Sequence, residues 1–233
     1  MEYILNVRNV SKTYQSGAKK LTVLHDISFA VETGSVVAIV GPSGSGKTTL
    51  LGLCAGLDQA SEGIIEFNEL RLDNRSEEER ALIRNRYIGF IFQSFQLMPT
   101  LTALENVMVP LELQGKKNIR PHAVSLLEKV GLADRLHHYP VQLSGGEQQR
   151  VSIARAFSTH PKILFADEPT GNLDDDTSNR IVPLLFELNR EAGTTLVIVT
   201  HNAELAESTQ RIIRLKGGHI VADERTGNSI PAV

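Results

Sequence analysis

The sequence predicts an α/β fold in which helices cover both faces of a doubly wound, mainly parallel sheet. Three short, nearly continuous apolar runs predict strands buried on both faces, as the strands of a parallel sheet are. They are residues 36–40, 163–166 and 195–200. Helical patterns follow them at residues 47–57, 177–192 and 203–208. This alternation of strand and helix is typical of a doubly wound core.

The N-terminal part predicts an antiparallel β-subdomain instead. Ile27, Phe29 and Val31 alternate with polar or small residues, which is the period-2 pattern of a strand that is buried on one face. Residues 3–32 therefore predict strands of a half-exposed sheet, and residues 64–67 predict another short strand.

Helical patterns dominate the middle of the chain, at residues 76–86 and 103–158. They predict a helical subdomain inserted into one α/β domain. The C-terminal part predicts a hairpin over residues 211–222, which turns at Lys216-Gly217-Gly218. The expected divisions are a core at 1–93 and 159–222, a helical subdomain at 94–158 and a tail at 223–233.

Composition excludes several classes of protein. The 233 residues are 41% hydrophobic and 22% charged, as in ordinary globular domains. The net charge of −3 provides no basic field to attract nucleic acid. Cys54 is the single cysteine, so no internal disulfide is expected. Because there is neither a signal-peptide pattern nor an 18-residue apolar window, we expect a chain that does not itself span a membrane.

A glycine-rich motif lies between the first buried strand and its helix. Residues 41–48 read GPSGSGKT and match G-x-x-x-x-G-K-[ST] in the required strand–loop–helix context. Glycines let such a loop turn its N–H groups toward phosphate oxygens, and the helix adds its positive N-terminal end. A chance match in a chain of this length has a frequency on the order of 1%. We therefore expect Lys47 to bind the β- and γ-phosphates and Thr48 to offer its hydroxyl to Mg²⁺.

Two carboxylates, Asp167 and Glu168, end the second buried strand. Alone, they indicate only a solvated strand end. Beside a phosphate loop they favour Mg-nucleotide chemistry, with Asp167 holding Mg²⁺ and Glu168 accepting a proton from the attacking water.

His201 follows the third buried strand. A lone histidine there is usually a polar loop residue, but ligands of open α/β sheets bind at this carboxyl edge, so His201 becomes a catalytic candidate. The other six histidines show no metal-ligand spacing. Cys54, among leucines of the first helix, is expected to be a small buried hydrophobe.

A second motif, LSGGEQQR, occupies residues 143–150 before a helical pattern. Ser144 and Glu147 have the spacing of a capping box, which predicts a helix start. The two glycines between them leave the first N–H groups uncovered, which favours the close approach of an anion. The two interpretations are compatible.

Together these motifs resemble those of the ABC-transporter ATPases, whose signature is LSGGQ where this chain has LSGGE; the family accepts Glu or Gln there. The resemblance covers residues 3–222 and includes Gln93, Gly171-Asn172-Leu173-Asp174 and His201 in the family's order. It implies a P-loop NTPase core that binds MgATP and hydrolyses ATP as a head-to-tail homodimer. Each ATP would lie between the phosphate loop of one subunit and the signature of the other.

The resemblance also implies the roles of individual residues. Tyr14 matches the aromatic residue that stacks on adenine, although a buried strand tyrosine is an open alternative. The residues expected to bind ATP are Tyr14, Gly41, Pro42, Ser43, Gly44, Ser45, Gly46, Lys47, Thr48, Thr49, Ser144, Gly145, Gly146 and Glu147. Those expected to act in catalysis are Glu168, His201, Gln93 and Lys47, and those expected to hold Mg²⁺ are Thr48, Gln93 and Asp167.

Residues 92–107 and 165–174 are similar to a narrower subgroup, the lipoprotein-release and macrolide-export subunits of the LolD and MacB type, with YbbA-like subunits. This resemblance implies a membrane-spanning permease partner that carries a periplasmic domain. Leu97, Met98, Leu101 and Leu104 are candidates for the groove that receives the partner. Core packing is the alternative, which is left open for Met98 and favoured for Leu104.

The expected function is therefore an ATP-binding subunit that drives export or extraction at the cytoplasmic face of the inner membrane. The alternative is a regulatory envelope ATPase that gates another membrane or cell-division enzyme. No nucleic-acid partner is expected, because soluble ABC proteins of that kind have two cassettes in one chain or long coiled-coil insertions.

Overall fold

The computed structural model describes residues 2–17 and 19–227 as two compact units. The first unit takes in residues 2–17, 19–84 and 195–227, and the second unit takes in residues 85–194.

In chain order, the structure begins with β1 (Tyr3–Ser16), β2 (Lys19–Glu32), β3 (Val36–Val40), α1 (Lys47–Cys54), β4 (Glu62–Phe67), β5 (Leu70–Arg71) and α2 (Glu77–Tyr87). The second unit continues with β6 (Ile88–Ile91), α3 (Ala103–Leu113), α4 (Arg120–Lys129), the 3-10 turns η1 (Ala133–Arg135) and η2 (Pro140–Gln142), α5 (Gly145–Phe157), β7 (Ile163–Asp167) and α6 (Asp175–Ala192). The chain then returns to the first unit with β8 (Thr195–Thr200), α7 (Ala203–Glu207), β9 (Arg211–Lys216) and β10 (His219–Arg225).

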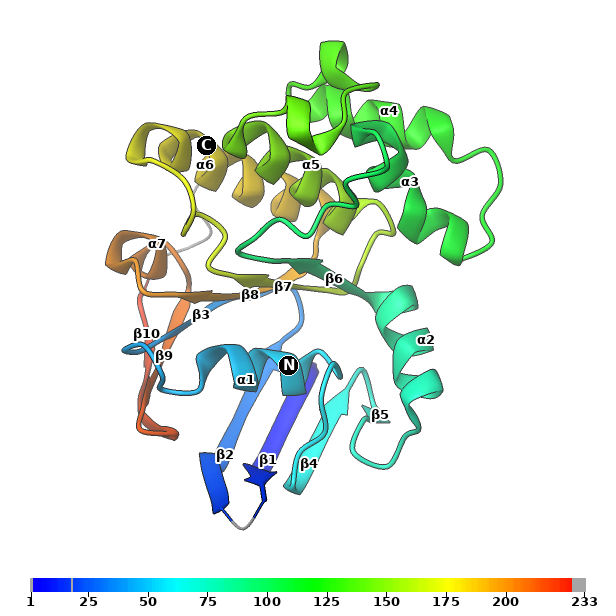
Figure 1. Cartoon of the computed structure of the whole chain (residues 1–233). Coiled ribbons are helices and arrows are strands. Elements are labelled where there is room, and N and C mark those ends of the chain that lie inside the picture. Colours follow the sequence, from blue (N-terminus) through cyan, green and yellow to red (C-terminus); the bar gives the residue numbers. More distant parts are fainter. Residues whose placement is uncertain (1, 18, 228–233) are drawn as a thin grey trace. The chain divides into compact units, whose positions relative to one another are not determined.

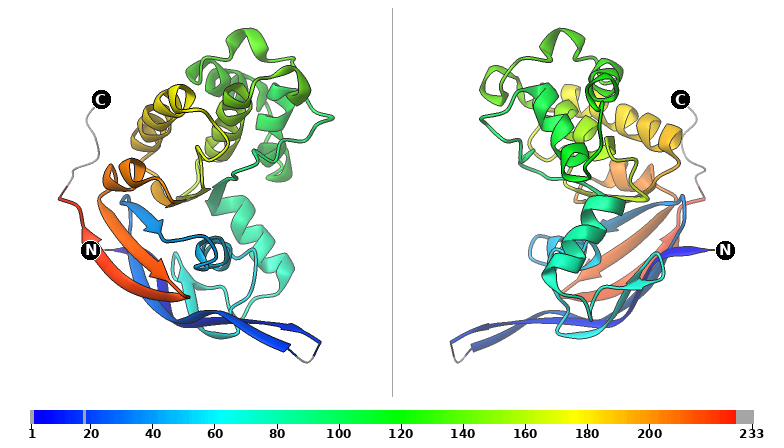
Figure 2. Two further views of the ribbon diagram at one scale, coloured as in Figure 1. Left: turned by 60° about the vertical axis from the view of Figure 1, so that its left-hand side comes forward. Right: turned by 90° about the vertical axis from the view of Figure 1, so that its right-hand side faces the viewer.

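The first unit contains an antiparallel sheet in the order β2-β1-β4-β5. Its long strands β1 and β2 form a ribbon that continues past the rest of the sheet (Figure 2). The alternation at Ile27, Phe29 and Val31 appears in the structure, because these three side chains are buried. The predicted antiparallel β-subdomain is confirmed.

A second layer of the first unit is mainly parallel. Strand β3 pairs in parallel with β8 on one side and with β9 on the other, and β10 closes the edge antiparallel to β9. Helix α1 contacts β2 and β4 from the antiparallel sheet and β8 from the parallel one, so it lies between the two layers (Figure 1). Four of its side chains, Leu50, Leu51, Leu53 and Cys54, are buried there.

The second unit is mainly helical, with β6 and β7 paired in parallel. Helix α5 packs against α3, α4 and α6, so it is the central helix of this unit (Figures 1 and 2). Seven of its thirteen residues are buried, which anchors the helix that follows the LSGGE motif.

The predicted fold class is confirmed, and strands β3 and β8 have the predicted bounds. The first helix is shorter than predicted: it ends at Cys54, because the chain turns at Gly56 with φ of 67°. Strand β6 was not predicted. Its four residues, IGFI, contain a glycine and only one buried isoleucine, so the apolar run is too weak to be distinguished from the helix before it.

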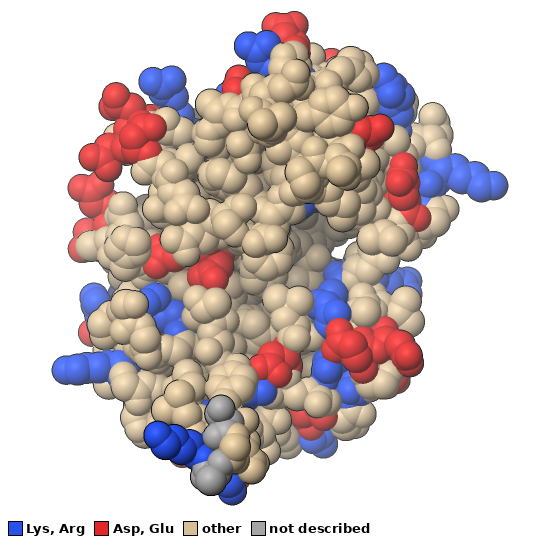
Figure 3. Space-filling view, viewed as in Figure 1, with Lys and Arg blue, Asp and Glu red and all other residues tan. Residues whose placement is uncertain are grey.

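Among the described residues, no helix is long and apolar enough to cross a membrane. On the face that Figure 3 shows, Lys and Arg side chains are interspersed with Asp and Glu, and the described residues there form no continuous basic surface.

Candidate active site

The phosphate loop, residues 41–48, connects β3 to α1. Helix α1 begins at Lys47, and its N-cap is Gly46 with φ of 97°, a conformation that side chains rarely adopt. Gly46 has no side chain to cap the helix, so the first N–H groups of α1 are available to an anion. A Cβ at Gly46 would also lie 2.7 Å from Leu24 Cδ2. Both the backbone conformation and the packing against β2 therefore require glycine here.

The start of the loop is equally restricted. A Cβ at Gly41 would lie 2.1 Å from the carbonyl oxygen of Leu215 on the neighbouring strand β9. Lys47 reaches back across the loop, and its Nζ donates to the carbonyl oxygens of Gly41 at 2.8 Å and Pro42 at 3.1 Å. The hydroxyl oxygen of Ser45 is buried and has no hydrogen-bond partner among the described residues. These features fit a loop built to surround a phosphate group.

His201 lies beside the same loop. It follows β8 and precedes Asn202, whose side chain caps α7 by accepting from Leu205 N at 3.0 Å. A cavity of about 460 Å³ is lined by Gly41, Pro42 and His201 together with residues of α7 and β9. The structure therefore brings His201 and the phosphate loop together, as the sequence predicts from the shared carboxyl edge of the sheet.

Tyr14 is 42% exposed, so it is not a buried strand tyrosine. Its hydroxyl donates to Asp58 at 2.9 Å, and Lys12 Nζ lies 4.7 Å from the ring centroid. Burial, the hydrogen bond to Asp58 and the charge of Asp58 raise the pKa of Tyr14. Burial alone would raise the pKa of Asp58, but hydrogen bonds from Lys12, the Gln59 N–H and Tyr14 outweigh it and lower that pKa. Tyr14 is thus a fixed, accessible ring, and adenine stacking stays a prediction.

Sequence reasoning missed Asp58. It lies 44 residues from Tyr14 with no recognisable motif around it, so only the fold identifies the pair.

In the second unit, Asp167 ends β7 and Glu168 follows it with φ of 46°, an uncommon value for a residue with a side chain. Gly171 lies close to both Glu168 and Gln93. A Cβ added at Gly171 would lie 3.2 Å from Glu168 Cβ and 3.1 Å from Gln93 Nε2. The side chain of Asn172 donates to the carbonyl oxygen of Gln93 at 2.8 Å. The structure therefore brings together two of the predicted catalytic residues, Gln93 and Glu168.

The LSGGE motif forms the predicted capping box at the start of α5. Ser144 Oγ accepts from Glu147 N at 3.3 Å, and Glu147 Oε2 accepts from Ser144 N at 2.8 Å. The hydrogen bond from Ser144 N is the largest cause of the lowered pKa of Glu147. Ser144 Oγ thus accepts from the Glu147 N–H, and the Ser144 hydroxyl also contributes to the lowered pKa of Glu147.

Glycine is required inside this motif, since a Cβ at Gly146 would lie 2.6 Å from Thr177 Cγ2. The backbone at Gly146 therefore packs directly against Thr177 of α6.

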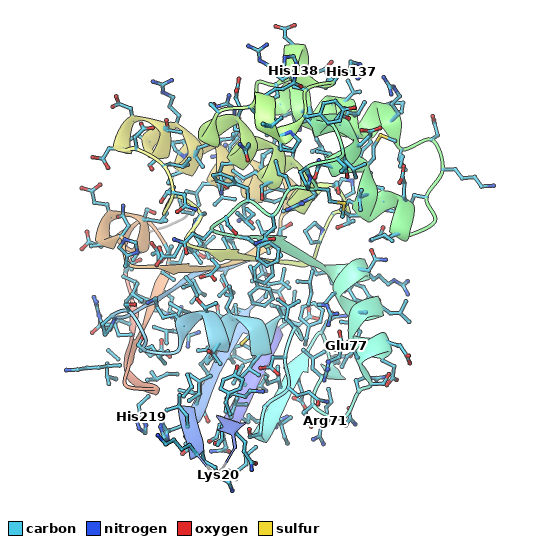
Figure 4. All side chains as sticks on the ribbon, viewed as in Figure 1. Lys20, Arg71, Glu77, His137, His138 and His219 are labelled. Carbon is cyan, nitrogen blue, oxygen red and sulfur yellow. The ribbon has the colours of Figure 1, made fainter. Side chains whose placement is uncertain are left out.

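The histidines other than His201 form no common site. Figure 4 shows His137 and His138 adjacent to each other on the segment between η1 and η2, and His219 at the β9–β10 hairpin. Among the described residues, no group of three or more His, Cys, Asp or Glu side chains could hold a metal ion by itself. Cys54 is buried, and burial raises its pKa to about 12, as expected of an inert thiol.

A glycine-rich phosphate loop after a parallel strand, together with a carboxylate pair at the end of another strand, defines a nucleotide-binding α/β protein of the P-loop class. Residues 24–171 match the ABC transporter family. The chain belongs to this family and is an ATP-binding subunit of an ABC transporter, with ATPase activity.

Individual relatives support this assignment over nearly the whole chain. The uncharacterised ABC transporter ATP-binding protein YbbA of Escherichia coli K12 is 50% identical over 94% of this chain and 97% of its own length. The lipoprotein-releasing system ATP-binding protein LolD of Idiomarina loihiensis is 46% identical over 92% of this chain and 95% of its own. The macrolide export ATP-binding/permease protein MacB of Bdellovibrio bacteriovorus is 44% identical over 98% of this chain, which covers 35% of that longer protein. The predicted subgroup is confirmed.

A solved structure shows the same fold. The ATP-binding cassette MJ0796, described as a dimer in a post-hydrolysis state bound to ADP and Pi, has a TM-score of 0.89 and 39% sequence identity. The similarity covers 97% of this chain and all of MJ0796.

Proposed function

We propose that this chain hydrolyses MgATP as a head-to-tail dimer and drives a separate permease of the lipoprotein-release and macrolide-export type. One observation carries the proposal. The chain has two glycine-rich helix starts, α1 after Gly46 and α5 after Ser144, and only the first contains a lysine that reaches across its loop. The helix start at α5 has no such lysine, so it suits a nucleotide that is already held by another copy of the chain. The dimeric state of MJ0796 supports this arrangement.

Within this proposal, each residue has a role that follows from its chemistry. Lys47 balances the charge of the β- and γ-phosphates, and Glu168 takes the proton of the attacking water. Gln93, next to Glu168 across Gly171, orients that water, and His201 hydrogen bonds to the terminal phosphate. Ser144, Gly145 and Gly146 bind the phosphates held by the partner subunit. Such hydrolysis needs positioning and electrostatics more than covalent chemistry.

Thr48, Gln93 and Asp167 offer hydroxyl, amide and carboxylate oxygens, the hard donors that Mg²⁺ prefers, so the residues fit the ion. When bound, Mg²⁺ would neutralise charge on the phosphates.

The second unit presents a surface that suits a membrane partner. Met98 is 45% exposed, whereas Leu104 is 1% exposed and belongs to the core. The loop that carries Met98 is held by the buried Asn106, whose side chain accepts from Met98 N and donates to the carbonyl oxygens of Met98 and Leu101. An apolar side chain on a rigid loop is a suitable docking point. The macrolide export ATP-binding/permease protein MacB joins the two functions in one protein, which supports a permease as the partner.

Affinity purification from detergent-solubilised membranes tests this function. We expect the chain to recover a membrane-spanning protein with a periplasmic domain, and ATP hydrolysis by the complex to exceed that of the chain alone. Recovery of a cell-division or other envelope enzyme without transport activity would favour the regulatory alternative. Recovery of no membrane protein would contradict both.

A further inference from the structure

Helix α5 is hydrogen bonded to the two loops that carry Gln93 and Glu168. Gln149 Nε2 donates to the carbonyl oxygen of Pro169, the residue after Glu168, at 2.7 Å. Six residues later along the helix, Arg155 donates from its two terminal nitrogens to the carbonyl oxygens of Gln96 at 2.7 Å and Phe95 at 2.8 Å. The helix that begins at the signature therefore contacts both catalytic loops of its own unit.

The turn that Arg155 holds is strained. Phe95 and Gln96 have φ values of 59° and 49°, and two consecutive left-handed residues that are not glycine are unusual, above all when one is aromatic. Such a conformation persists only where the surroundings enforce it. The planar guanidinium, with N–H groups in a fixed fork, suits two neighbouring carbonyl oxygens better than any other side chain.

The environment of Arg155 is also unusual. Burial lowers its pKa, yet a guanidinium stays charged in proteins. Among the described residues Arg155 forms no ion pair, so the two carbonyl oxygens accept the hydrogen bonds of a largely buried charge. Burying a cation without a carboxylate is costly, and hydrogen bonds to a charged donor are correspondingly strong. A simple packing role would be filled at lower cost by an apolar side chain.

Two further contacts connect this turn with the signature and with Gln93. The Phe95 ring lies 3.9 Å from the position that a Cβ on Gly145 would take, and the side chain of Asn172 donates to the Gln93 carbonyl oxygen. The thirteen residues of α5 extend about 20 Å at 1.5 Å per residue, from the signature to Arg155 and beyond. One rigid element therefore spans from Ser144 to the Gln93 loop.

We infer that Arg155 is a positioning residue: it fixes the Phe95–Gln96 turn to the signature helix, so that Gln93 takes its catalytic position when the signature engages the partner subunit's ATP. The inference rests on the proposed role of Gln93. It predicts that loss of the Arg155 guanidinium lowers the rate of ATP hydrolysis without weakening ATP binding, because the phosphate loop belongs to the other unit.

The test compares Arg155→Met and Arg155→Lys with the wild-type full-length chain. Met keeps the apolar stem and removes the fork, whereas Lys keeps the charge but cannot bind both carbonyl oxygens in the same way. We expect kcat to fall at least tenfold for Arg155→Met, as a misplaced catalytic group costs, and to fall less for Arg155→Lys. The ATP dissociation constant should stay within about twofold of wild type. Hydrogen–deuterium exchange should rise selectively in peptides that cover residues 93–98.

Leu126→Ala provides the control for lost stability. Leu126 is buried in α4 of the same unit, and its apolar side chain forms no hydrogen bond to these loops. At a matched loss of thermal stability, this variant should keep its turnover and should not show selective exchange at residues 93–98. If Leu126→Ala reproduces the phenotype of Arg155→Met, or if Arg155→Met keeps wild-type turnover, the inference is wrong.

The Gln93→Ala variant tests the proposed catalytic role of Gln93 separately from the proposed role of Arg155. Wild-type turnover in Gln93→Ala would reject the proposed role of Gln93, and the inference with it. Lost turnover in Gln93→Ala with normal turnover in Arg155→Met would reject the inference alone.

Discussion

Lys47 Nζ lies 2.8 Å from the carbonyl oxygen of Gly41, so the side chain at the end of the phosphate loop returns to the loop's first residue. The same ammonium also donates to the carbonyl oxygen of Pro42 at 3.1 Å. Exchanging these carbonyl contacts for phosphate oxygens would keep the charge in the loop while strengthening its hydrogen bonds.

Lys47→Ala is therefore expected to abolish measurable ATP binding, since it removes the fixed positive charge of the loop. Equilibrium binding of a fluorescent ATP analogue measures this. Lys20→Ala, a change at an exposed lysine of β2, serves as the matched control and should bind normally. Unchanged affinity in Lys47→Ala would contradict the assignment of the phosphate loop.

Glu168→Gln should retain ATP binding and lose hydrolysis by roughly 10²–10⁴-fold, the usual contribution of a general base. The amide keeps the shape of the side chain, so ATP should trap the dimer, which size-exclusion chromatography with ATP can detect. Glu187→Gln, on the exposed face of α6, should behave as wild type. Near-normal turnover in Glu168→Gln would move the catalytic role elsewhere, with His201 the first candidate.

Ser144 should act on the nucleotide of the partner subunit. Neither Lys47→Ala nor Ser144→Arg homodimers should hydrolyse ATP, because each lacks one half of both sites. A mixed dimer has one interface with an intact loop and an intact signature, so mixing the two variants should restore part of the activity. ATP-dependent cross-linking between Ser144 and the phosphate loop should accompany this measurement. Failure of that cross-link under ATP, in wild-type protein, would argue against the head-to-tail arrangement.

Met98→Glu should release the chain from membranes that contain its permease while ATP binding survives. An unpaired carboxylate is costly to bury in an apolar groove, and Met98 is exposed in the free chain. Membrane sedimentation and ATP binding should be measured on one preparation. Leu104→Glu is the contrasting variant: Leu104 is buried, so both properties should be lost together. A folded Met98→Glu protein that stays fully membrane-bound would exclude Met98 as a docking contact.

The capping box at α5 should make part of the stability depend on pH. Chiefly the hydrogen bond from Ser144 N lowers the pKa of Glu147 below its ordinary 4.5, with the Ser144 hydroxyl and Arg135 adding to the effect and burial opposing it. A lowered folded-state pKa stabilises the fold above the unfolded-state value, and this contribution is lost as the pH falls from about 4.5 through the folded-state pKa.

Glu147→Gln, which keeps a hydrogen-bond acceptor but cannot titrate, should therefore lose less stability than wild type between pH 5 and pH 3. Urea unfolding across this range measures the difference. Equal pH dependence in the two proteins would show that Glu147 does not contribute.

Much of this protein follows from its sequence. The apolar runs at β3 and β8 predict strands that are buried on both faces, because exposing apolar side chains to water on either face is unfavourable. The phosphate loop and the capping box at Ser144 are local: their hydrogen bonds join residues at most six positions apart, so spacing alone predicts them.

Other features were decided only by the tertiary structure. Asp58 meets Tyr14 across 44 positions, and Arg155 meets Phe95 across 60, with no motif that relates either pair. The exposure of Met98 was also beyond the pattern, which left docking and core packing open for it, whereas the burial of Leu104 is the interpretation that the pattern favoured. A local motif determines its own backbone through steric limits and short-range hydrogen bonds, whereas partners distant in sequence are chosen by how whole elements pack.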